Sequence, residues 1–234
     1  MEKVYRNTAI FIVFIILGVQ WGFYTVYTSQ FPNFKDKSSM VHIHGALMMT
    51  WMFLLVLQPL LISTGRAEIH RTIGKVSYVL GPVLIISLFL IGKSGYWHGV
   101  RENIPEKESL GTMSLDIRGL LSFALFWALA MINRKNSASH MRYMIGTGIL
   151  AIGPGIGRGL INEFGIGFHQ SLTITDIIEI AIPAICLVYD INSKKNYRPW
   201  LTMLVVMIIG ALLWQLRYSD LWQAFAAKYA ELLY

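Results

Sequence analysis

Six histidines lie near the ends of long apolar segments, and they are the residues best suited to chemistry in this chain. They are His42, His44, His70, His98, His140 and His169. An imidazole ring is costly to bury at a membrane boundary unless a metal ion, a haem iron or a carboxylate holds it. The sequence therefore predicts that some of these histidines are ligands of a metal or a haem.

Charged side chains inside the apolar segments form a second set of candidates. They are Asp116, Arg118, Arg158, Glu163, Asp176 and Glu179. A charge at the centre of a membrane helix costs roughly 2.5–3.5 kcal/mol, so such residues face the bundle interior and pair there. Two interpretations stay open. The four carboxylates are catalytic or proton-relay groups of a polar cavity, or arginine–carboxylate pairs simply hold helices together.

Membrane-spanning helices are the elements expected to position both sets. Apolar residues make up 55% of the 234 residues and charged residues 14%, against about 25% in soluble domains. Mean hydropathy is +0.52. Because a spanning helix needs about 20 apolar residues, we expect one all-α polytopic domain over residues 1–234. The expected spans are 8–28, 41–63, 73–94, 114–133, 141–163, 173–191 and 199–217.

The segment after the last span differs from the spans themselves. Apolar side chains recur at helical spacing through 218–234, which predicts an amphipathic helix in the membrane interface. The single cysteine, Cys186, excludes an intrachain disulfide and a thiolate metal cluster.

The formal charge of +7 comes from basic residues in short loops between apolar runs. Such residues are typical of topology determinants and lipid-headgroup contacts, so the expected partner is the lipid bilayer and not a nucleic acid. Lys and Arg are more frequent on the side of the N-terminus. The distribution predicts a cytoplasmic N-terminus and an external C-terminus.

On the expected outer side, His44 is the deeper of two histidines that open the second span. His42 lies about 200° from it around a helix, so the two can bind one centre only if the segment is not yet helical there. His42 is interpreted as an interfacial residue, and so is His98 in its aromatic run. With His169 and carboxylates of the same leaflet, His44 would form a mixed Zn²⁺ or Fe site.

On the expected inner side, His70 precedes the third span and His140 begins the fifth. One histidine from each of two neighbouring helices at equal depth suits a haem with two axial imidazoles. Both also stand beside arginines at the membrane edge, where capping or phosphate binding is an equal alternative.

The fifth span contains the run Gly153-Pro154-Gly155-Ile156-Gly157-Arg158-Gly159. Two interleaved GxxxG patterns allow a neighbouring helix to approach closely, and such packing is the default interpretation. The alternatives are a flat cofactor lying on the glycine face, or a proline-broken helix whose free amides bind an anion beside Arg158.

Several short motifs together resemble a family of bacterial multi-pass membrane proteins known chiefly as a domain of unknown function. The motifs are His44-Gly45, Gln58-Pro59-Leu60, His70-Arg71-x-x-Gly74, Tyr78, His140-x-Arg142-x-Met144 and Arg158. The match covers roughly residues 41–163 and implies a bacterial inner (cytoplasmic) membrane location.

In outline the family is similar to the ascorbate-reducible transmembrane b-type cytochromes and related two-haem membrane cytochromes. The similarity implies haem b, with His70 and His140 on the inner haem and with Arg118 and Arg158 balancing propionates. For an outer haem His44 lies on the required span. The fourth span has no histidine, so His169 would have to substitute from the loop before the sixth span.

The expected function is therefore a membrane-embedded haem- or metal-binding protein, an oxidoreductase that moves electrons between a quinone or small reductant and an acceptor. One alternative is an outer-leaflet non-haem Zn or Fe enzyme with a His/carboxylate site. A second is a non-catalytic solute-binding, transport or assembly protein.

Overall fold

The computed structural model describes residues 2–34 and 37–234, and within these ranges every regular element is a helix. Seven segments are long and apolar enough to cross a membrane, which confirms the all-α polytopic bundle and makes the chain a multi-pass membrane protein. The spans are α1 (Glu2–Tyr24), α2 (Ser39–Ser63), α4 (Ser77–Arg101), α5 (Glu106–Ile132), the pair α6 (Ser137–Ile149) and α7 (Ile152–Phe164), α8 (Phe168–Asn192) and α9 (Arg198–Gln215).

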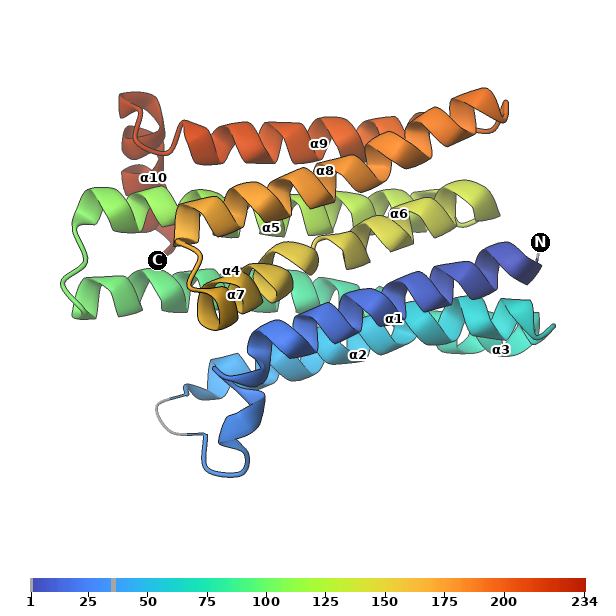
Figure 1. The fold of residues 1–234 in the computed structure, drawn as a ribbon, viewed down its shortest axis with the longest axis horizontal. Helices are drawn as coiled ribbons and strands as arrows, with labels where there is room; N and C mark the ends of the chain where they lie inside the picture. Colours follow the sequence, from blue (N-terminus) through green and yellow to red (C-terminus); the bar gives the residue numbers. More distant parts are fainter. Residues whose placement is uncertain (1, 35–36) are drawn as a thin grey trace.

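Three short elements complete the chain, namely η1 (Thr28–Gln30), α3 (Ala67–Gly74) and α10 (Asp220–Leu233). The helix expected after the last span is confirmed: α10 crosses the end of the bundle and packs on α5 (Figure 1). Helix α3 was not expected. Its eight residues are too few and too polar to register as an apolar run, so the third span begins at Ser77 and not at 73.

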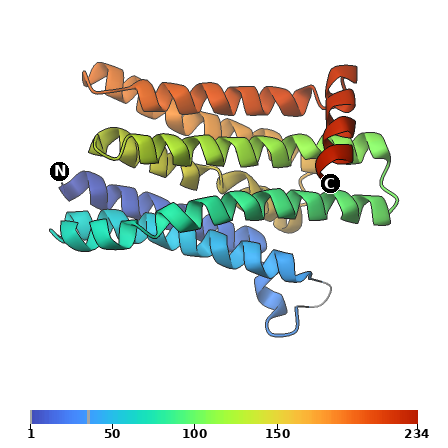
Figure 2. The same ribbon diagram turned by 180° about the vertical axis from the view of Figure 1, so that it is seen from behind.

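The spans lie side by side, and the bundle has two distinct ends (Figure 2). The N-end carries the N-terminus, α3 and the turns at 64–66, 133–136 and 193–197. The C-end carries η1, the connections at 102–105 and 165–167, and α10.

The spans form a closed ring around a broken helix. Helix α1 packs on α2, α2 on α4, α4 on α5, α5 on α9, α9 on α8, α8 on α7, and α7 again on α1. Helix α6 instead contacts α1, α2, α5 and α9, so it stands inside the ring in the N-end half. The chain then leaves the centre and joins the wall as α7. The C-end half therefore has no central helix.

The fifth span expected over 141–163 is present as Ser137–Phe164, and it is broken at Leu150–Ala151 between α6 and α7. Pro154 has no N–H to donate to the carbonyl of Leu150, and a proline inside a helix opens the preceding turn. The freed Gly153 N–H donates to Glu179 Oε1 at 2.7 Å. From the sequence, a proline-broken helix that binds an anion was one alternative for this span. The helix is broken, but the Glu179 carboxylate of the same chain caps it in place of an external anion.

Close packing explains the glycines of α7. A Cβ at Gly155 would lie 2.8 Å from Val19 Cα, and one at Gly22 would collide with the Gly155 carbonyl. Gly159 faces the Trp21 ring in the same way. The default packing interpretation is confirmed for this face. Because α1 occupies it, no flat cofactor lies there.

The middle of the bundle is a sealed apolar core. Trp51, Phe123, Phe126, Ile149 and Met203 are each at most 2% exposed. The Trp51 ring meets Phe123 edge-on, with ring centroids 5.4 Å apart. This packing separates the polar side chains of the N-end half from those of the C-end half.

Candidate functional site

At the N-end, three polar side chains from different helices come together. Gln58 lies near the end of α2, His70 on α3 and His140 on α6. The two imidazoles are close enough to interact electrostatically, and His70 lies beside the backbone of Gln58. We call Gln58, His70 and His140 the N-end site. His70 reaches it from α3, and not from a span as the cytochrome similarity implies.

Hydrogen bonds fix which ring nitrogen of His140 is free. Its Nδ1 lies 2.9 Å from the Ala130 carbonyl oxygen. A carbonyl only accepts, so Nδ1 carries the proton and Nε2 of the neutral ring keeps a lone pair. Metal-bound histidines show the same arrangement, in which the second nitrogen donates to a carbonyl or carboxylate.

His70 contributes a second imidazole. Its Nδ1 is buried and has no hydrogen-bond partner among the described residues. Burial lowers the pKa of His70 below its usual 6.5, with smaller contributions from His140 and Arg71. Since the folded pKa is depressed, the neutral ring persists somewhat below pH 6.5. The His70 ring is therefore neutral at pH 7, and one of its two nitrogens keeps a lone pair.

The Gln58 side chain adds two more unpartnered atoms. Both Nε2 and Oε1 are buried without a hydrogen bond. Leaving a buried polar group unpaired costs about 1–3 kcal/mol, and native structures contain few such groups. Gln58 and His70 together carry three such atoms, so the N-end site has unused hydrogen-bonding capacity.

A second polar region lies in the C-end half, where no helix fills the centre. Arg158 on α7 interacts electrostatically with His44 on α2 and with Asp116 on α5. Arg158 is exposed and the other two are half-exposed.

Two glycines of this region border open space. Gly119 shares an interior stripe of α5 with Asp116 and the buried Phe123, yet a Cβ at Gly119 would meet no atom within 4 Å. The same holds for Gly45, beside His44. We call the region of His44, Gly45, Asp116, Gly119 and Arg158 the vestibule.

The polar atoms of the vestibule are only partly engaged. Ser87 donates its hydroxyl proton to the Leu84 carbonyl at 2.8 Å, so it accepts from His44 Nδ1 at 3.1 Å. The Nε2 of a neutral His44 therefore keeps a lone pair. Asp116 has no hydrogen-bond partner among the described residues.

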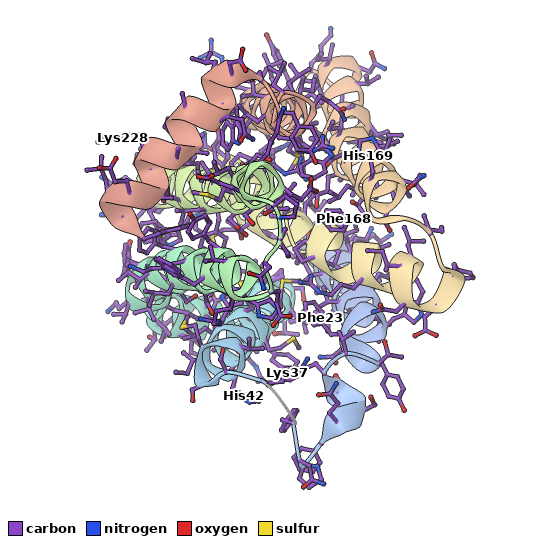
Figure 3. The ribbon with its side chains drawn as sticks, turned by 90° about the vertical axis from the view of Figure 1, so that its left-hand side faces the viewer. Phe23, Lys37, His42, Phe168, His169 and Lys228 are labelled. Carbon is purple, nitrogen blue, oxygen red and sulfur yellow. The ribbon has the colours of Figure 1, made fainter. Side chains whose placement is uncertain are left out.

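Arg158 is held by groups that leave its charge unpaired. It donates to the Pro154 carbonyl at 2.8 Å, and its guanidinium lies 4.6 Å from the centre of the Phe23 ring. Within residues 2–34 and 37–234 no carboxylate oxygen lies within 4.0 Å of it. Phe23 lies near the middle of the C-end view, between α1 and the other walls (Figure 3).

The other charged candidates hold helices together. Arg118 makes two bonds to Asp176, at 2.7 and 3.2 Å, and also donates to the Gly210 carbonyl. Glu179 caps α7 through Gly153. The helix-pairing interpretation is confirmed for Arg118 and Asp176, which join α5 to α8.

The remaining candidates lie away from both regions. Glu163 is exposed and borders a groove of about 430 Å³ on α1, with Gln20 and Tyr24. His169 is exposed at the start of α8, its ring 6.2 Å from that of Trp214. His42 bonds the Tyr27 hydroxyl at 2.7 Å, as suits an interfacial residue, and it lies across the end view from His169 (Figure 3).

The expected outer metal set is therefore not assembled. His169 lies apart from His44, and Asp176 and Glu179 already have partners. In the described part of the chain no three His, Cys, Asp or Glu residues are grouped as a metal site. The sequence placed these residues toward the same end of the spans, but it did not show which helix faces meet.

Several residues of both regions were not among the sequence candidates. Gln58 had a usable signal, since an amide within an apolar span on the stripe of His44 is unusual. Ser87, Gly119 and Phe23 had none, because isolated small or aromatic residues are ordinary in membrane helices.

No known protein family, curated protein or solved structure matches this chain.

Proposed function

We propose that this chain is a membrane-embedded redox protein that binds haem b through His70 and His140. The observation that carries the proposal is a pair of neighbouring imidazoles, of which His140 keeps a lone pair on Nε2 and His70 has a buried Nδ1 without a hydrogen-bond partner. Two neutral imidazoles from separate helices are the ligand set of low-spin b-type haem.

When bound there, a haem iron accepts and releases single electrons. The Ala130 carbonyl holds the His140 ring in the tautomer that leaves Nε2 free to ligate, and the Gln58 backbone lies beside His70. The sealed core around Trp51 keeps water from the C-end half out of the site. Electron transfer between a quinone or small reductant and an acceptor follows as the activity.

A single Fe or Zn ion is the second candidate, and the Gln58 side chain is the observation that favours it. Its unpartnered amide oxygen would complete a set of two imidazoles and one oxygen, which suits a transition metal without porphyrin. Both candidates use His70 and His140. They differ in whether the purified protein contains haem or a metal ion without porphyrin.

The test is an absorption spectrum of the detergent-purified protein, oxidised and then reduced with dithionite. We expect a Soret band that shifts on reduction and sharp α and β bands. His70→Ala and His140→Ala should each abolish these bands, while His98→Ala, at the exposed end of α4, should keep them. A colourless protein with stoichiometric iron or zinc would favour the ion, and one with neither would reject both.

We also propose that the protein lies in a bacterial inner membrane, with the N-end in the cytoplasm. The excess of Lys and Arg at the N-end supports this orientation. Reporter fusions test it. An alkaline phosphatase fused after Tyr234 should be active, and a cytoplasmic fluorescent protein fused there should be dark. The reverse pattern would overturn the orientation.

A further inference from the structure

The vestibule offers three polar groups whose hydrogen-bonding roles are set by their surroundings. His44 Nε2 is an acceptor, because Nδ1 donates to Ser87. The Asp116 carboxylate is a second acceptor, and the Arg158 guanidinium has donors left after its bond to Pro154. A matching ligand carries two hydroxyl donors and at least one oxygen that accepts from Arg158.

The surroundings also restrict the shape of that ligand. The stripe of α2 that carries His44 continues to the buried Trp51, and the stripe of α5 that carries Asp116 continues to the buried Phe123, so two aromatic rings close the vestibule toward the core. Phe23 adds a third ring on the α1 side. Aromatic walls favour a flat, weakly polar ring over a sugar or an aliphatic diol.

The charges argue against a simple anion. Arg158 would attract a carboxylate or phosphate, but Asp116 interacts with the same guanidinium and would repel that ligand. A neutral dihydroxy compound satisfies all three groups and buries no new charge.

From these contacts we propose that the vestibule binds a small hydroquinone, held by hydroxyl donation to His44 and Asp116 and by donation from Arg158. This site would take the reductant of the proposed redox protein and rests on that function for its biological use. The binding itself does not depend on the N-end site.

Binding of 2,3-dimethylhydroquinone tests the proposal, measured anaerobically by equilibrium dialysis with the full chain in detergent. The unmodified protein should bind one molecule, and Asp116→Asn and His44→Phe should each weaken binding about tenfold or more. Matched probes are 1,4-dimethoxybenzene, which lacks both donors, and benzoate. Equal binding of dimethoxybenzene, or binding of benzoate in place of the hydroquinone, would overturn the proposal.

A variant that fills the vestibule without changing its charge distinguishes a loss of binding from a loss of folding. Gly119→Leu should place its side chain in the open space and abolish binding while the thermal unfolding midpoint stays near that of the unmodified protein. Unchanged hydroquinone affinity in this variant would place the ligand elsewhere and reject the proposal.

His70→Ala separates this proposal from the haem proposal. It should lose the haem spectrum and keep hydroquinone binding. If the unmodified protein holds no haem but binds the hydroquinone, the redox function fails and the vestibule assignment stands. If haem is present and the hydroquinone does not bind, the reverse holds.

Discussion

At the scale of single residues, the ability of a histidine to bind a ligand depends on the hydrogen bond that its Nδ1 makes, because that bond decides whether Nε2 keeps a lone pair. Ala130 and Ser87 offer acceptors to His140 and His44, and each leaves the opposite nitrogen with a lone pair. His42, by contrast, uses Nδ1 on the Tyr27 hydroxyl at the bundle end. The six rings are chemically equal in the sequence, and their hydrogen bonds make them different.

The buried ion pair of the N-end half gives a residue-scale prediction. Arg142 and Asp190 lie 2.7 Å apart, with side chains 10% and 4% exposed, and join α6 to α8. Asp190→Ala would leave a buried guanidinium unpaired, so we expect a loss of about 3–5 kcal/mol in the free energy of unfolding. Denaturant titration in mixed micelles measures it.

The exposed pair of Lys228 and Glu231 is the matched control, and Glu231→Ala should cost at most about 1 kcal/mol. The double variant Arg142→Met with Asp190→Leu should recover most of the lost stability, since apolar replacements of similar volume remove both charges together. Equal losses in the buried and exposed variants would contradict the assigned role of burial.

At the scale of elements, the break between α6 and α7 decides the shape of the interior. Helix α6 fills the centre of the N-end half, and α7 lies in the wall of the C-end half. Pro154 opens the turn and Glu179 caps the new helix start. One interrupted span therefore produces both the tight N-end half and the vestibule.

Glycines at the α1–α7 contact give an element-scale prediction. Gly155→Ala would put a Cβ 2.8 Å from Val19 Cα, so α1 and α7 must separate, and we expect a destabilisation of about 1–3 kcal/mol. Gly45→Ala is the control, because its Cβ meets nothing within 4 Å. Thermal unfolding of the two variants should differ clearly, and equal midpoints would refute the close-packing account.

At the scale of the whole molecule, the ring of spans keeps two polar regions apart. The same stripe of α2 begins at His44 and ends at Gln58, a rise of about 21 Å, with Trp51 sealing the middle. A protein built this way can bind different molecules at its two ends without a continuous water path between them.

The sequence by itself determined the membrane-spanning segments and the helix after them, because 20-residue apolar runs fold as helices in lipid whatever lies beside them. It also offered arginine–carboxylate pairing as one of two interpretations of the charges inside the spans. It did not show α3, whose eight residues are too short for any periodic signal.

Only the tertiary structure decided which charges meet. Asp116, Asp176 and Glu179 look alike in the sequence, yet one lines open space, one pairs with Arg118 and one caps a helix. The physical reason is that local sequence fixes a helix and its faces, whereas the rotation and order of helices around the ring depend on packing among residues far apart in the chain.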